Sequence, residues 1–218
     1  MHQSRYTIYM PIVLLNVSAK LACQFERPTA CPYCGSKRVL SWGQVTRTIQ
    51  DSKPIQLEIH RNFCEYCKHT FRSYPPGIDR STYSLRFRRL AGLFWLMDLS
   101  CRDIVDIFQE MGISINRMKI WREGQNLVNY LTSRRIISFS NLWSLERYVG
   151  METHPRGSTS LAVCLEPGHY SEIGTIITSN PLLVVSWLKA ILKDLDIEVL
   201  LLETKELTDI SNGNKNGN

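Results

Sequence analysis

The sequence has no long hydrophobic run. No window of its 218 residues approaches the roughly 20 consecutive apolar residues that a membrane-spanning helix needs. The apolar run at residues 12–15 is bounded by Pro11 and Asn16, and Lys20 stands where a signal peptide has a small neutral residue. We therefore interpret residues 1–27 as an N-terminal leader or strand. We expect a cytosolic protein with no membrane partner, whose thiols stay reduced.

Acidic residues are scarce in the first half of the chain. Residues 31–135 hold 17 Lys/Arg against 9 Asp/Glu, whereas residues 136–218 hold 6 against 10. An apolar content of 44% with 21% charged residues is that of a globular protein. The charge asymmetry indicates two units with different roles, of which the basic one would attract a polyanion.

Four of the seven cysteines form two Cys-x-x-C pairs, in CPYCG and CEYCK. In a reducing compartment this spacing predicts one tetrahedral Zn²⁺ site with four ligands, Cys31, Cys34, Cys64 and Cys67. Strand-forming residues between the pairs, broken by a turn at QDSKP, predict a hairpin. Two such turns joined by a hairpin describe a zinc ribbon over residues 28–76, with Zn²⁺ as a structural cofactor. The remaining three cysteines have no partner at ligand spacing and are interpreted as ordinary thiols.

Three helices are expected over residues 80–135. The first, at 82–97, carries an apolar face. The second begins after Ser100 and ends at Gly112, and the third begins after Ser114 and continues through Met118 and Trp121. A short helix, a glycine-containing turn and a capped helix are typical of a helix-turn-helix.

This pattern indicates binding to double-stranded DNA, because the start of the third helix would enter the major groove. The alternative is an ordinary three-helix bundle with solvated polar faces. The candidate DNA-contacting residues lie on the first and third helices: Arg86, Arg88, Arg89, Asn116, Arg117, Lys119 and Arg122.

The acidic half predicts a different unit, over residues 145–208. Strands are expected at 148–153, 160–165 and 172–178, followed by a helix that begins at Pro181. The run IEVLLLET is apolar on both faces, which favours a strand parallel to the first. The order β-β-β-α-β opens a ribonuclease-H-like sheet. Residues 209–218 have the composition of a disordered tail, and the fold class expected for the whole chain is α+β.

Together these segments resemble bacterial insertion-sequence transposases. The resemblance rests on the four-cysteine ribbon, FRSYPPGIDRSTYSLR, LSCRDIVDIFQEMGISINRMKIWRE, YVGMETHPRG and IEVLLLETKE, and it covers about residues 28–208. It implies binding to transposon-end DNA, a nucleoid-associated location, and strand cleavage and transfer by three carboxylates that hold two Mg²⁺ ions.

The family's catalytic positions match this chain incompletely. Its first and second Asp fall on Glu152 and Glu203, and its third carboxylate has no counterpart before Asn218. Because Mg²⁺ demands near-ideal octahedral geometry, a carboxylate one methylene longer fits it poorly. The expectation is a truncated, catalytically inactive transposase-like DNA-binding protein, with Mg²⁺ bound only if it is active.

Two alternatives stay open: a transposase subunit completed by another chain, and a zinc-ribbon adaptor that binds protein. Whether the chain forms a homo-oligomer is also open.

Overall fold

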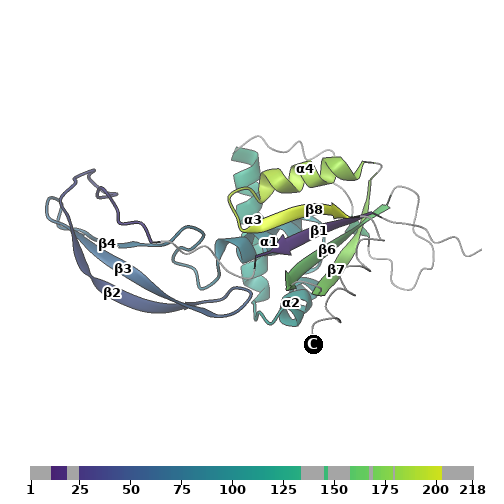
Figure 1. Ribbon diagram of the computed structural model, residues 1–218, viewed down its shortest axis with the longest axis horizontal. Helices are drawn as coiled ribbons and strands as arrows, with labels where there is room; N and C mark the ends of the chain where they lie inside the picture. Colours follow the sequence, from purple (N-terminus) through teal and green to yellow (C-terminus); the bar gives the residue numbers. More distant parts are fainter. Residues whose placement is uncertain are drawn as a thin grey trace, which may run out of the picture. The chain divides into compact units, whose positions relative to one another are not determined.

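The computed structural model describes residues 11–18, 25–133, 145–146, 158–166, 169–178 and 180–202. The chain forms two compact units, Lys20–Arg88 and a second that combines Met1–Ala19 with Arg89–Asn218. The described part holds four helices and two β-sheets, so the fold is mixed α+β (Figure 1). The division between the units falls inside helix α1 (Leu85–Leu96).

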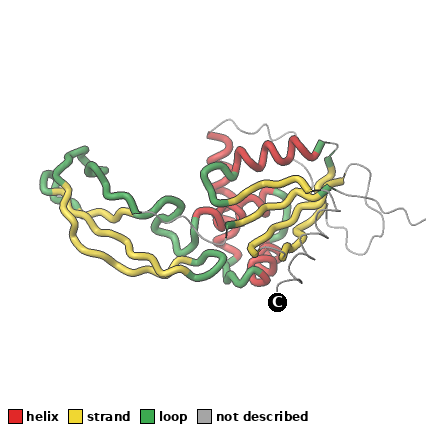
Figure 2. Tube along the Cα trace, viewed as in Figure 1, coloured by secondary structure: helices red, strands yellow, loops and turns green. Residues whose placement is uncertain are grey.

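The first unit is built on a three-stranded antiparallel sheet in the order β2-β3-β4 (Figure 2). Its strands are β2 (Val39–Ile49), β3 (Ile55–Cys64) and β4 (Thr70–Ser73). The predicted hairpin is confirmed, because β2 and β3 pair from Val39↔Cys64 to Ile49↔Ile55. A bulge between Ser41 and Gln44 interrupts the pairing, and Gly43 supplies the positive φ of 109° within it.

A buried ion pair fixes the tip of this hairpin to the start of the first helix. Asp51 follows β2, and its carboxylate accepts a hydrogen bond of 3.0 Å from Nε of Arg86 and a second from its terminal guanidinium nitrogen. Both side chains are fully buried. Backbone bonds add to the connection, since Gln50 donates to the carbonyl of Thr82 at 2.6 Å and accepts from the N–H of Ser84 at 3.1 Å.

Three helices follow: α1 (Leu85–Leu96), α2 (Cys101–Glu110) and α3 (Arg117–Ser133). The Ser100 hydroxyl caps α2 as predicted, accepting a 3.2 Å bond from the N–H of Asp103. Gly112, at φ 75°, follows the end of α2. The predicted cap of the third helix is corrected from Ser114 to Asn116, whose side-chain oxygen accepts from the N–H of Met118 at 2.8 Å.

Two glycines allow α1 and α3 to pack closely. A Cβ atom at Gly92 would lie 2.8 Å from the carbonyl oxygen of Glu123, and one at Gly124 would lie 2.3 Å from the ring of Trp95. Such distances are far below van der Waals contact, so the crossing requires the absence of a side chain at both positions. Between α1 and α2, Phe94 and Phe108 pack edge to face with ring centroids 6.1 Å apart.

The five-stranded sheet has the order β5-β7-β6-β1-β8. Its strands are β1 (Ile12–Val17), β5 (Leu145–Glu146), β6 (Ser158–Glu166), β7 (His169–Ile177) and β8 (Ile197–Leu202). β1 pairs parallel with β6 and antiparallel with β8. Helix α4 (Pro181–Ile191) is capped by Asn180, contacts β8 and β1, and buries Val184 and Leu188.

This sheet corrects the predicted topology. The N-terminal strand β1, which the sequence analysis left outside the acidic-half unit, lies between β6 and β8, with Val13 and Leu15 fully buried. The strand at the IEVLLLET run is therefore antiparallel to its described neighbour. Its predicted parallel partner at residues 148–153 lies outside the described residues.

Candidate metal centre and helix surface

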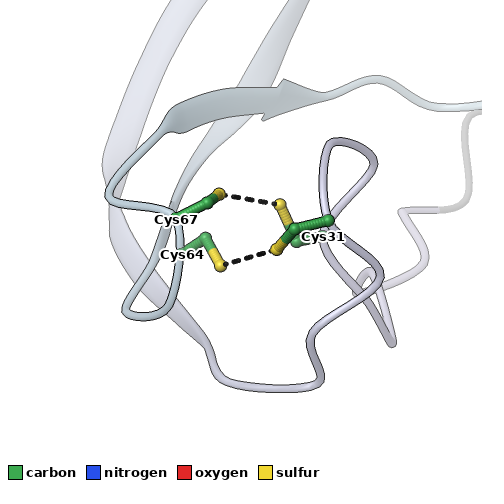
Figure 3. A group of neighbouring side chains, drawn as sticks. Cys31, Cys64 and Cys67 are labelled. Carbon is green, nitrogen blue, oxygen red and sulfur yellow. Dashed lines mark hydrogen bonds between the residues drawn. The ribbon is translucent and has the colours of Figure 1, made fainter.

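The four predicted cysteines form a single cluster. Their sulfur atoms all lie within 4.8 Å of one another. The Sγ–Sγ distance is 3.6 Å for Cys31 and Cys67 and also for Cys34 and Cys64 (Figure 3). Four sulfurs around Zn²⁺ at about 2.3 Å would stand roughly 3.8 Å apart, so the cluster has the size of a tetrahedral metal site. The four cysteines can hold a metal ion such as zinc.

The two Cys-x-x-C turns have matching backbone geometry. The N–H of Gly35 donates to the carbonyl of Cys31 at 2.9 Å, and the N–H of Lys68 donates to that of Cys64 at the same distance. Gly35 and Lys68 occupy equivalent positions at φ 71° and 61°. Lysine rarely adopts a positive φ, so the surrounding structure must hold Lys68 in this conformation. The turns aim both cysteine pairs at one point.

Backbone N–H groups and neighbouring thiols shift the pKa values of Cys64 and Cys34 in opposite directions. The N–H groups of Cys67 and Tyr66 stabilise the Cys64 thiolate and lower its pKa to about 6. The N–H of Ser36 favours the Cys34 thiolate, but burial and the other three cysteines together outweigh it and raise its pKa to about 12. Four thiolates this close repel one another, and a divalent cation would remove that repulsion.

A metal ion held by these cysteines would have sulfur at all four tetrahedral positions. Two nearby histidines, His60 and His69, have other contacts. His69 lies 2.9 Å from the carbonyl oxygen of Cys67 through Nδ1, and the His60 ring stacks on Phe25 with centroids 3.6 Å apart.

On helix α3, three of the predicted DNA-contacting residues are exposed. Asn116, Arg117 and Arg122 are exposed, while Ile120, Leu127 and Leu131 are buried. The fourth, Lys119, is half-buried and forms a 2.7 Å ion pair with Glu123, one helical turn on.

Two apolar residues of α3 are also exposed. Met118 is 55% exposed and Trp121 is 47% exposed. The sequence placed both residues in this helix without assigning them to a face, and periodicity alone does not fix where the buried stripe is centred. The buried stripe includes Glu123 and Gly124. The exposed face of α3 therefore combines two cations, an amide and an indole.

The three arginines of α1 are engaged inside the protein. Arg86 is 1% exposed and pairs with Asp51. Arg88 pairs with Asp79, and the Arg89 guanidinium lies 3.8 Å from the centroid of the Tyr130 ring. The expectation that Arg86 contacts DNA is corrected, since a buried side chain has no surface to offer a phosphate. Arg88 and Arg89 are both mostly buried, and their guanidinium groups contact Asp79 and the Tyr130 ring.

Glu152 and Glu203, the two positions matched to family carboxylates, lie outside the described residues. Within the part of the chain that the structure describes, the cysteine cluster is the one group of His, Cys, Asp or Glu side chains arranged to hold a metal ion. Among these same residues, no helix has the length and apolar character needed to cross a membrane.

Comparison with known proteins gives no relative, because no family model, curated protein or solved structure matches this chain.

Proposed function

We propose that this chain is a DNA-binding protein whose first unit is stabilised by Zn²⁺. The observation that carries the proposal is the exposed N-terminal half of α3. There Arg117, Trp121 and Arg122 are exposed to solvent. The helix follows α2 through the turn at Gly112, as in a helix-turn-helix whose second helix reads the major groove.

The chemistry of this face suits duplex DNA. Arginine donates two hydrogen bonds to the edge of guanine, and asparagine pairs with adenine. The side-chain oxygen of Asn116 caps the helix, so we assign this residue a positioning role. The base-contacting role is given to Arg117 and Arg122. Lys119 is held by Glu123 and contributes less.

In this proposal Zn²⁺ has a structural role. A small ribbon buries little apolar surface, so metal binding supplies much of its folding free energy. The resemblance to insertion-sequence transposases supports the same assignment, with transposon-end-like duplex DNA as the target class. In the same proposal the chain is catalytically inactive, because glutamates, Glu152 and Glu203, stand at the two positions matched to family aspartates.

The test is duplex binding by the zinc-loaded full chain, measured by fluorescence anisotropy. Arg117→Ala should weaken binding to a preferred sequence by roughly 1–3 kcal/mol if it contacts a base. Lys193→Ala removes the same charge from an exposed site outside α3 and should leave affinity nearly unchanged. Equal effects of both variants would count against a specific surface on α3. Binding that does not change with salt would favour the adaptor alternative.

A further inference from the structure

One face of the ribbon sheet combines exposed aromatic and arginine side chains. Strand alternation places Arg61 and Phe63 on the side opposite Asn62 and Cys64, which are buried. The register adds their cross-strand neighbours, since Leu40 and Thr70 lie opposite Phe63 and Arg72 lies opposite Arg61. We call this surface the open ribbon face. It consists of Leu40, Trp42, Arg61, Phe63, Thr70 and Arg72.

Its aromatic part is exposed and fixed in position. Trp42 is 55% exposed, and its ring centroid lies 5.2 Å from that of Phe63 at an angle of 37°. Trp42 stands in the bulge between Ser41 and Gln44, and bulges commonly redirect a side chain. The Lys68 ammonium lies 5.9 Å from the Phe63 ring centroid. An exposed indole beside a second ring and a cation forms a platform on which a flat group can stack.

Its basic part lines a hollow. Arg61 and Arg72 lie directly opposite each other on β3 and β4, an arrangement of like charges that destabilises a sheet. Together with Arg80, Thr70 and Phe71 they line a shallow hollow of about 350 Å³. Three of its five lining residues are arginines and none is acidic. An anion bound in the hollow would relieve the repulsion between the guanidinium groups.

We propose that the open ribbon face binds single-stranded nucleic acid. A phosphate would occupy the arginine hollow, and an unpaired base would stack on Trp42 and Phe63. The single-stranded form is favoured because the faces of paired bases are already covered by their neighbours, whereas an unpaired base has a free π-face. This site belongs to the ribbon unit and is independent of the duplex site proposed on α3.

The test compares two ligands and two sites on the zinc-loaded full chain. A labelled thymidine 20-mer and a labelled 20-base-pair duplex are titrated at about 50 mM salt. Trp42→Ala should weaken binding to the single strand at least about fivefold, while Trp42→Phe keeps a ring and should restore most of it. Arg72→Gln should also weaken it, and Lys53→Gln, which removes an exposed charge elsewhere in the unit, should not.

The outcome separates this site from the duplex site. Arg117→Ala should lower duplex affinity and leave single-strand affinity unchanged. Zinc content and the thermal melting curve of each variant show that the ribbon is folded. Undetectable binding of the single strand, or equal single-strand affinities for the unmodified chain and a folded Trp42→Ala or Arg72→Gln variant, would overturn the proposal.

Discussion

At the scale of single residues, the cysteine cluster leads to a specific prediction about metal content. The N–H groups of Cys67 and Tyr66 lower the pKa of the Cys64 thiol to about 6, and its sulfur lies 3.6 Å from that of Cys34. We expect the reduced protein to contain one Zn²⁺ per chain, because four sulfur ligands close a tetrahedral site. Cys64→Ser should abolish zinc binding and unfold the ribbon.

Elemental analysis and circular dichroism check this expectation. Cys101→Ser is the matched control, since Cys101 lies outside the cluster on α2 and should leave the zinc content unchanged. Well under one zinc per chain in the unmodified, reduced protein would contradict the assignment.

The buried pair of Asp51 and Arg86 gives a second prediction. Burial opposes ionisation of Asp51, but the hydrogen bonds and positive charge of Arg86, with a further hydrogen bond from the N–H of Ser52, outweigh it and hold the pKa of this carboxyl below its usual value of 3.8. Asp51→Asn leaves the guanidinium buried and uncompensated, and should cost roughly 3–5 kcal/mol of unfolding free energy at pH 7. Urea denaturation measures this loss.

The stabilisation from the Asp51–Arg86 pair decreases at acidic pH. The pKa is lower in the folded state, so the stabilisation is fully present above about pH 4 and is lost as the pH falls through the folded value. The Asp51→Asn variant should therefore lose less stability on acidification than the unmodified chain. An unchanged unfolding free energy at pH 7 would show that the pair contributes nothing.

At the scale of elements, the crossing of α1 and α3 depends on two glycines. Glycine to alanine inside a helix ordinarily stabilises a protein by about 0.5–1 kcal/mol. At Gly124 the added Cβ would meet the Trp95 ring at 2.3 Å, so we expect the opposite sign, a loss of about 1–3 kcal/mol. Asn129→Ala, at an exposed position of α3, is the control and should be neutral or stabilising. A higher melting temperature for Gly124→Ala would contradict the packing described.

The elements that sequence reasoning found are those with local signals. The Cys-x-x-C turns, the hairpin and the Ser100 cap each depend on residues a few positions apart. The features that the sequence did not predict depend on residues far apart along the chain. Nothing near Arg86 in the sequence shows that Asp51, 35 residues earlier, will bury it. The central place of β1 likewise follows from pairing with strands more than 140 residues later.

At the scale of the whole molecule, the basic region of the chain also contains the candidate metal centre. The basic residues 31–135 contain the cysteine cluster and all three helices proposed to position the DNA-contacting surface. Because Zn²⁺ is proposed to stabilise the first unit and α3 belongs to the second, removal of the metal should act on the open ribbon face through the folding of the first unit. Chelation should lower single-strand affinity, and returning one equivalent of Zn²⁺ should restore it, while duplex affinity at α3 stays nearly unchanged, as anisotropy would show.

The most direct test of the central claim is the salt dependence of duplex binding by the zinc-loaded chain. Each phosphate neutralised by the protein contributes about −0.9 to the slope of log affinity against log salt concentration. We predict a clear negative slope, and Arg122→Ala, which removes a proposed base contact, should weaken binding with little change in that slope. A flat slope, or no binding at about 50 mM salt, would contradict the assignment of this protein to DNA.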